Sequence, residues 1–464
     1  MSRSEVKTLP WRGALGMLML YAGKASGILV TLLFIPLYNR TLGPEQFGIV
    51  AVILSLQALL IMLDFGLSTL VSRDVATGQI ASKKLWAEIR NAERALLSLY
   101  LVILSVVVAA WAWGVFGSIS VVALVCSIVL FGFLVLQNLH YCIIIANRQY
   151  VRASMLQSGG NLVRAAVTAM VLSNYSSTLE AFVVVQAVFA GLQAWSTRAQ
   201  SAQLYRHHPA GNLEQETYGN WPETLHLMRR SAPLALFAGA GAAVMQLDKP
   251  IISAFMTSAS VGPYFLAMTL CMVPTSVLAG PVTQYFQPKV LEDPSKRHAG
   301  HVRTTVDRFT LTLLAATLVP CAIIWLLRTP LISLWLGNRY ENELVANYVE
   351  ILLPGVMIGA LGYIPYTLLL GVQDYRFQAV LSLSLTALTL LAATWAASRQ
   401  SVGAVTIIYA LYHISSTTLS WGRAIYLPAT RELALRSGRT ALLSLLAVGL
   451  VLLLARPENS LNFI

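Results

Sequence analysis

Charged residues are scarce in this 464-residue chain: Asp, Glu, Lys and Arg make up 11% of it, whereas hydrophobic residues make up 56%. Soluble proteins carry about a quarter charged residues. The deficit excludes an ordinary soluble domain and indicates a polytopic membrane protein. The net charge of +12 does not indicate nucleic-acid binding, because an excess of Lys and Arg on cytoplasmic loops is how a membrane protein sets its orientation.

Cysteine and the motifs of catalysis are also scarce. All four cysteines lie inside apolar runs, where a thiol behaves as a small hydrophobic group: Cys126, Cys142, Cys271 and Cys321. The sequence contains neither a nucleotide-binding Walker A motif nor the H-E-x-x-H spacing of a metal site, and its loops are short. We therefore expect no disulfide, no metal, no cofactor, no built-in ATPase and no enzymatic activity.

Long apolar runs are abundant instead. Thirteen runs have about the length that crosses a bilayer, roughly twenty residues, except for the short last one. Each is expected to be an α-helix, since a helix satisfies its backbone hydrogen bonds within one segment. The runs cover residues 13–37, 47–70, 95–116, 118–146, 154–173, 179–195, 232–256, 261–286, 305–327, 345–370, 379–397, 402–425 and 441–455.

Basic residues distinguish the two ends of these runs. With the amino terminus in the cytoplasm, nearly all Lys and Arg fall on inner segments, as the positive-inside rule requires. The outer segments hold only Arg40, Arg328, Arg339, Arg399 and, if the last run spans, Arg456. We therefore predict a multi-pass protein whose amino terminus is cytoplasmic.

The runs form two similar halves. The second set of six follows the first by roughly 220 residues, a regular spacing that indicates an internal repeat. An even number of spans per half makes the repeats parallel, which is a transporter layout. The predicted fold class is all-α: two parallel six-helix bundles, with twelve core transmembrane helices, around a central cavity, plus one extra C-terminal helix. The predicted boundaries are 1–203 for the first lobe, 204–230 for a cytoplasmic linker, 231–428 for the second lobe and 438–456 for the additional short helix.

Among the ionisable residues within or at the edge of the runs, we single out six: Lys24, Arg164, Lys249, Arg308, Asp64 and Asp248. A charge at the centre of a membrane helix costs roughly 3 kcal/mol, so each is expected to face a cavity or a partner. We assign the four cations to substrate binding and the two carboxylates to ion coupling. For Arg308 we favour a positive-inside anchor. Two alternatives stay open: Asp64 makes a structural contact at the end of its helix, and Asp248 pairs with a cation from another span.

Helical spacing indicates which face each charge uses. Lys24 lies on one stripe with Gly16, Gly27 and Thr31, and Arg164 lies on a polar stripe with Gln157, Asn161 and Thr168. Neither cation has a carboxylate at helical spacing in its own span, so a water-filled cavity is the favoured environment. Adjacent Asp248 and Lys249 point about 100° apart on a helix and are not expected to neutralise each other.

Two further features have alternative interpretations. A polar group on the fourth run either reads a sugar or bonds between helices; it comprises Gln137, Asn138, His140 and Tyr141. The tenth run is interrupted by small and helix-breaking residues, which either bend it during transport or permit close packing: Pro354, Gly355, Gly359, Gly362 and Pro365.

The loop between the first two runs carries a specific pattern. Residues 36–48 read P-L-x-x-R-x-L-G-x-x-x-F-G, and residues 63–67 read L-D-x-G-L. This pattern resembles the Wzx-type polysaccharide (O-antigen and exopolysaccharide) flippase family of the multidrug/oligosaccharidyl-lipid/polysaccharide exporter superfamily. The residues that match are Pro36, Leu37, Arg40, Leu42, Gly43, Phe47, Gly48, Leu63, Asp64, Gly66 and Leu67.

The resemblance implies a function and a location. Members of the family move undecaprenyl-diphosphate-linked oligosaccharide from the cytoplasmic to the periplasmic leaflet of the bacterial inner membrane, by ion-coupled alternating access. It also implies a polysaccharide polymerase and chain-length proteins as partners. A diphosphate is anionic, so the Lys and Arg in the first lobe suit it. The alternatives are a multidrug or small-molecule exporter of the same superfamily and a non-transporting scaffold of polysaccharide assembly.

Overall fold

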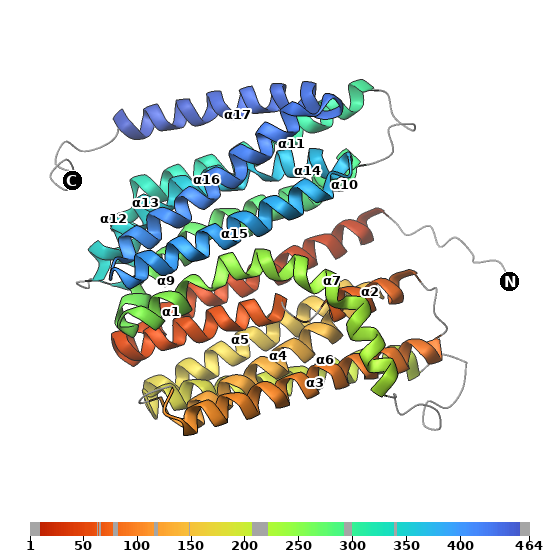
Figure 1. Ribbon diagram of the computed structural model, residues 1–464, viewed down its shortest axis with the longest axis vertical. Helices are drawn as coiled ribbons and strands as arrows, with labels where there is room; N and C mark the ends of the chain where they lie inside the picture. Colours follow the sequence, from red (N-terminus) through yellow and green to blue (C-terminus); the bar gives the residue numbers. More distant parts are fainter. Residues whose placement is uncertain are drawn as a thin grey trace. The chain divides into compact units, whose positions relative to one another are not determined.

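The computed structural model (Figure 1) describes residues 10–62, 64, 66–77, 82–115, 119–147, 149–206, 221–291, 299–337 and 341–454. Every regular element in these ranges is a helix. The chain divides into two compact units, Met1–Gln246 and Leu247–Ile464.

The first unit begins with a helical hairpin. Its helix α1 has two arms that meet at Gly43, whose φ of 75° is a left-handed conformation that glycine adopts without a steric penalty. The chain doubles back there, as the sequence predicts (Figure 1). The elements of this unit are α1 (Pro10–Met62), α2 (Leu67–Thr77), α3 (Ser82–Ala112), α4 (Val121–Ala146), α5 (Tyr150–Asn174), α6 (Leu179–Arg206) and α7 (Trp221–Gln246).

Helices α1, α4, α5 and α6 form the interior of the first unit, with α1 packed along α5 and α4 packed along α6. Tyr38 of α1 is buried and connects three of these helices. Its hydroxyl donates to the carbonyl of Ala165 in α5 at 3.0 Å, and its ring meets the ring of Phe182 in α6 edge-on at 5.3 Å. The polar stripe of α5 is therefore held against neighbouring helices.

The second unit contains the remaining helices. A short π-helical segment, η2, begins at Pro274 and joins α9 to α10 within one long stretch. The elements are α8 (Asp248–Phe255), η1 (Ser258–Ser260), α9 (Val261–Val273), η2 (Pro274–Ala279), α10 (Gly280–Leu291), α11 (Ala299–Leu326), α12 (Arg328–Leu336), α13 (Glu341–Leu361), α14 (Tyr363–Gly371), α15 (Tyr375–Ser398), α16 (Val402–Tyr426) and α17 (Pro428–Leu454).

Ten helical stretches in the described ranges are long and apolar enough to cross a membrane, compared with thirteen predicted runs. The first run and most of the second lie together in α1, and the end of the second run lies in α2. Helices α5 and α7 are not among the ten. For α5 the reason is its polar stripe, which lowers its hydropathy although the helix is 25 residues long. The last run is part of α17, which at 27 residues is longer than the predicted short helix.

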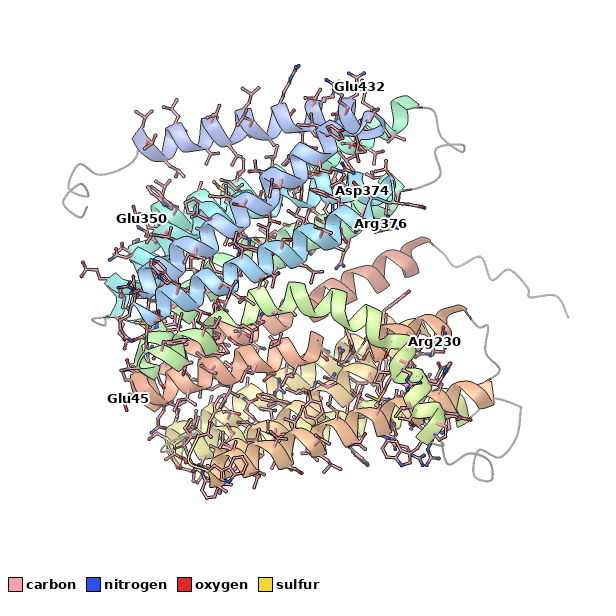
Figure 2. The ribbon with its side chains drawn as sticks, viewed as in Figure 1. Glu45, Arg230, Glu350, Asp374, Arg376 and Glu432 are labelled. Carbon is pink, nitrogen blue, oxygen red and sulfur yellow. The ribbon has the colours of Figure 1, made fainter. Side chains whose placement is uncertain are left out.

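The ends of each unit agree with the predicted alternation of loops. In the first unit, Glu45 of a predicted outer loop and Arg230 of a predicted inner segment lie at opposite ends of the helices (Figure 2). In the second unit, Glu350 lies at the end opposite Asp374 and Arg376 (Figure 2). In the first unit, predicted inner and outer segments thus lie at opposite ends. In the second unit, Glu350 pairs with Arg328 of a predicted outer segment at 2.8 Å and lies at the end opposite the predicted inner loop.

The boundary between the units differs from the predicted linker at 204–230. Helix α7, whose apolar part was predicted to open the second lobe, packs on α1, α2 and α3 and belongs to the first unit. Arg230 of α7 explains this packing, because it pairs with Asp74 of α2 at 2.9 Å and with Glu88 of α3 at 3.2 Å. Residues 207–220 of the linker lie outside the described part.

Close packing explains part of the glycine content of the tenth run. A Cβ added at Gly355 of α13 would lie 2.6 Å from Cα of Ala410 in α16, and backbone atoms cannot move aside cheaply. The run is also broken, since α13 ends at Leu361 and α14 begins at Tyr363. Both interpretations of this run thus have a structural basis.

We expect Gly355→Ala to destabilise the protein by about 1–3 kcal/mol, the usual effect of overpacking. Gly403→Ala in α16 is the matched control, because a Cβ there meets nothing within 4 Å. Thermal unfolding of the purified protein in detergent measures both changes. Equal stability of the two variants would contradict the close contact between α13 and α16.

Candidate functional site

Arg164 is a cation of the first unit that has no ion-pair partner among the described residues. It projects from the middle of α5, and its Nη2 lies 3.5 Å from Oδ1 of Asn161, a long hydrogen bond. Its Nη1 is enclosed and, among the described residues, has no hydrogen-bond partner. The ion pairs of the described ranges likewise include none with Arg164. A half-buried guanidinium with unused donors is suited to an anionic ligand.

The other members of the Arg164 stripe bond to neighbouring helices. Gln157 accepts from the side-chain amide of Gln137 in α4 at 2.5 Å. Thr168 accepts from the side-chain amide of Gln186 in α6 at 3.1 Å. These bonds hold the stripe away from lipid, as predicted. For Gln137 they favour the interpretation as interhelical bonding.

Lys24 lies in α1, in a stretch whose side chains are outside the described part of the structure. Its stripe can still be located through Gly27, one turn further along. A Cβ added at Gly27 would lie 3.7 Å from Nδ2 of Asn161, and α1 packs along α5. The backbone of the Lys24 stripe therefore adjoins the stripe that carries Arg164.

Asp248 and Lys249 form an ion pair, which corrects the prediction that adjacent residues would not neutralise each other. Lys249 Nζ lies 2.8 Å from Asp248 Oδ1. The prediction considered only the directions of the two Cβ atoms, and both residues indeed lie in the first turn of α8, which begins at Asp248. At the first turn of α8 the carboxylate also accepts the backbone N–H of Lys249 at 3.0 Å, and the flexible Lys side chain reaches back to it.

A tyrosine completes this buried pair. Asp248 is 0% exposed, and its Oδ2 accepts from the hydroxyl of Tyr264 in α9 at 2.8 Å. Both carboxylate oxygens are thus engaged within the second unit. Lys249 is consequently not an open cation like Arg164, and the geometry favours a structural role for the pair over substrate binding.

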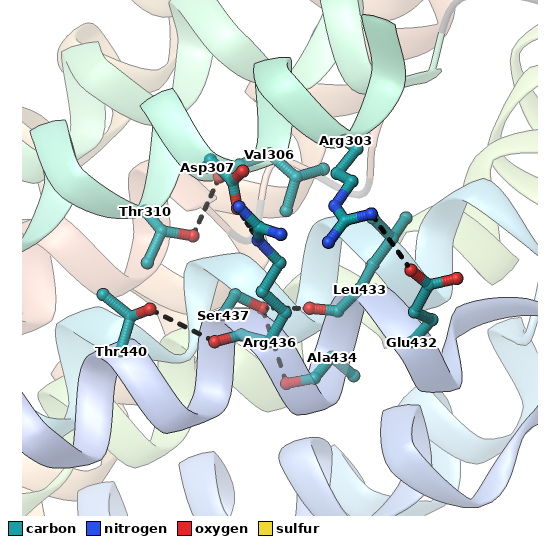
Figure 3. Close-up of polar contacts among 10 residues, drawn as sticks. All are labelled: Arg303, Val306, Asp307, Thr310, Glu432, Leu433, Ala434, Arg436, Ser437 and Thr440. Carbon is teal, nitrogen blue, oxygen red and sulfur yellow. Dashed lines mark hydrogen bonds and ion pairs between the residues drawn. The ribbon is translucent and has the colours of Figure 1, made fainter. Parts of the chain in front are cut away.

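Arg308 is exposed on α11, in the region where α11 meets α17. Its neighbour Asp307 pairs with Arg436 of α17 at 2.8 Å, and Arg303 pairs with Glu432 at 3.6 Å (Figure 3). Glu432 and Arg436 lie at the inner end assigned by the sequence. This position agrees with the favoured interpretation of Arg308 as a positive-inside anchor.

Asp64 organises the start of α2. Its Oδ1 accepts the backbone N–H of Gly66 at 2.9 Å, and its Oδ2 accepts that of Ser68 at 3.1 Å. A carboxylate that receives otherwise unpaired N–H groups stabilises a helix start. This geometry favours the structural alternative for Asp64.

We expect Asp64→Ala to lower stability by about 1–2 kcal/mol, as loss of such acceptors does, whereas Asp64→Ser retains an acceptor and has a smaller effect. Thermal unfolding of the purified protein in detergent measures both changes. An Asp64→Ala protein as stable as the native one would contradict this structural role.

Sequence reasoning missed one buried cluster in the first unit. Glu93 of α3 contacts His140 of α4 at 2.9 Å and Arg198 of α6 at 2.8 Å. Glu93 and Arg198 had been treated as loop charges, because both stand just outside the predicted runs 95–116 and 179–195. The only signal was His140, within the polar group of the fourth run.

A sequence profile described as "Polysaccharide biosynthesis protein" matches residues 37–345. The chain belongs to this family. The resemblance stated from the loop around Gly43 is thereby confirmed, and the match extends from this loop into the second unit. No protein of curated function matches this polysaccharide biosynthesis protein significantly in sequence.

Solved structures share the fold of this polysaccharide biosynthesis protein. The lipid II flippase MurJ, in an inward closed conformation, aligns over 97% of this chain and 94% of its own with 12% identity and a TM-score of 0.72. An inward-facing multidrug resistance MATE family transporter of the MOP superfamily aligns over 87% of this chain and 97% of its own, with 14% identity and a TM-score of 0.66. A MOP superfamily transporter from Pyrococcus furiosus aligns over 88% of this chain and 94% of its own, with 14% identity and a TM-score of 0.57. The predicted all-α transporter fold class is confirmed.

Proposed function

We propose that this protein is a flippase that moves undecaprenyl-diphosphate-linked oligosaccharide from the cytoplasmic to the periplasmic leaflet of a bacterial inner membrane. The observation that carries the proposal is Arg164, a half-buried arginine whose enclosed Nη1 has no hydrogen-bond partner among the described residues. Membership of the polysaccharide biosynthesis family and the fold of the MOP superfamily support it. A cytoplasmic amino terminus is part of the proposal, supported by the distribution of Lys and Arg.

Arg164 and Lys24 act on the diphosphate in this proposal. The guanidinium offers a planar fork of donors that matches two phosphate oxygens, and the Lys ammonium adds a compact charge. Such contacts hold the diphosphate, which all substrates of this class share, and leave the sugar loosely read. Once outside, the oligosaccharide is available to a polysaccharide polymerase and chain-length proteins.

The energy for transport is proposed to come from an ion gradient, since the sequence has no nucleotide-binding motif. Binding an ion and substrate to alternative states of the two units would shift their populations in turn. Asp248 is fixed by Lys249 and Tyr264 and Asp64 by two backbone groups, so neither is well placed to exchange a proton.

Flipping in reconstituted vesicles tests the proposal. Vesicles that contain the protein and a fluorescent polyprenyl-diphosphate oligosaccharide should expose the sugar to an external lectin faster than empty vesicles do, and collapse of the ion gradients should remove most of the difference. A polyprenyl alcohol that carries the same sugar without phosphate is the control substrate. Equal rates for both lipids would contradict diphosphate recognition, and transport of a cationic dye instead would indicate a small-molecule exporter.

A further inference from the structure

The cluster of Glu93, His140 and Arg198 joins three helices of the first unit through buried charge. The Glu93 carboxylate receives Arg198 Nε on Oε1 at 2.8 Å and Arg198 Nη2 on Oε2 at 3.0 Å. The same Oε1 lies 2.9 Å from His140 Nε2. A carboxylate held in this two-point fashion by a guanidinium is ionised. It therefore has no proton to donate to the histidine.

The second ring nitrogen of His140 has a defined partner as well. Its Nδ1 lies 2.7 Å from the hydroxyl of Ser201 in α6. That hydroxyl also lies 3.1 Å from the carbonyl of Arg198; when it donates its single proton to this carbonyl, it accepts from Nδ1. Nε2 faces an acceptor-only carboxylate at 2.9 Å, although the contact is not aligned as a hydrogen bond. With Nδ1 donating to Ser201, a proton bound at Nε2 would make the ring an imidazolium beside its counter-ion.

We propose that His140, with Glu93 as its counter-ion, is the proton-binding site of this transporter. With the proton bound, the cluster holds two cations and one anion. When the proton leaves Nε2, the neutral ring keeps its bond to Ser201, and Glu93 keeps both bonds to Arg198. No charge is stranded in either state. The lost attraction is the one between α4 and α3, so protonation controls how firmly these helices are joined.

Few charged groups surround His140, so we assign the binding and release of the proton to its ring alone. The charges that face His140 in the described ranges are Glu93 from α3 and, through it, Arg198 from α6. On α2, Asp74 is already paired with Arg230 of α7. Helices α1 and α5 contribute no charged contact to the ring among the described residues. The His140 side chain is 0% exposed and that of Arg198 is 43% exposed, so the cluster reaches the surface on the Arg198 side.

The inference rests on the proposed ion-coupled transport, but the charge of the ring can be measured without transport. The full chain, with ¹⁵N-labelled histidine in lipid nanodiscs, should give an imidazolium signal at neutral pH that disappears in His140→Gln. His413 is the internal control: it is buried in the second unit with an unpartnered Nε2 among the described residues and should be neutral. A neutral His140 ring at mildly acidic pH would overturn the proposal whether or not the protein is a flippase.

Transport tests the coupling itself. In vesicles, an imposed pH gradient should accelerate flipping of the polyprenyl-diphosphate oligosaccharide severalfold for the native protein, whereas His140→Gln should flip at one rate with or without the gradient. Ser127→Ala on the same helix is the matched control, because the Ser127 hydroxyl bonds only within α4, to Ala123. A normal response to the gradient in His140→Gln would overturn the proposal. Loss of the response with a retained rate separates a proton site from a structural ion pair.

Discussion

Alanine in place of Arg164 is expected to abolish polysaccharide export while the protein stays at its normal level in the membrane. Export is expected to fail without a loss of folded protein because Arg164 has no carboxylate partner among the described ion pairs. Its removal therefore leaves no opposite charge unpaired. Removal of a central charge even relieves an insertion cost of roughly 3 kcal/mol. What is lost is the only fork of donors that the α5 stripe offers to a diphosphate.

In Arg164→Ala and Lys24→Ala strains, the amount of surface polysaccharide measures export, and immunoblots measure the protein level. Charge-keeping swaps refine it: Arg164→Lys and Lys24→Arg should retain part of the activity if charge alone matters, and lose it if the shape of each head group is required. Arg308→Ala is the matched control, since Arg308 is an exposed cation and should export normally. Wild-type export from both alanine strains would exclude the cationic site.

Replacing Lys249 by methionine is expected to destabilise the protein by about 3–5 kcal/mol, the usual consequence of leaving a buried charge without its partner. Asp248 is 0% exposed, and in this variant it would retain only neutral donors, Tyr264 and the backbone N–H. The double variant Asp248→Asn with Lys249→Met should recover much of the loss, because it removes both charges together. Thermal unfolding in detergent measures the stability of the native protein, of Lys249→Met and of the double variant.

An exposed pair provides the control for this experiment. Arg303 and Glu432 lie 3.6 Å apart with side chains 50% and 82% exposed (Figure 3), and pairs of this kind contribute at most about 1 kcal/mol. Arg303→Met should therefore change stability little. A Lys249→Met protein as stable as Arg303→Met would show that the Asp248 charge is compensated otherwise. A stable Asp248→Asn protein that fails in gradient-driven flux would restore Asp248 as a coupling residue.

Local sequence was sufficient for the helices and for the stripe of Arg164. Hydropathy and helical spacing are properties of neighbouring residues, and membrane helices satisfy their own backbone, so most runs could be placed without knowing their partners. Gly43 is a similar case, because a turn that requires positive φ depends on a few residues only. The family motif around it identified the family for the same reason.

Partners could not be predicted in this way. Pairing of Glu93 with His140 and Arg198 joins three helices, and hydropathy carries no information about which helices touch. The sequence also did not indicate this cluster because Glu93 and Arg198 lie just outside predicted runs, where charged residues are interpreted as part of loops. For Asp248 and Lys249, the rule of 100° per residue failed because it gives the directions of Cβ atoms and not the reach of a flexible Lys side chain, which bends back to the neighbouring carboxylate.

The sequence by itself therefore determined that this is a helical multi-pass membrane protein with an arginine on a polar stripe of α5, whereas its two similar halves and the orientation of its basic loops stay predictions. Only the tertiary structure decided that α7 belongs to the first unit, that Lys249 is neutralised while Arg164 is not, and that His140 lies between Glu93 and Ser201. The physical reason is that burial of a run depends on its own composition, whereas the state of a buried charge depends on which side chains packing brings to it.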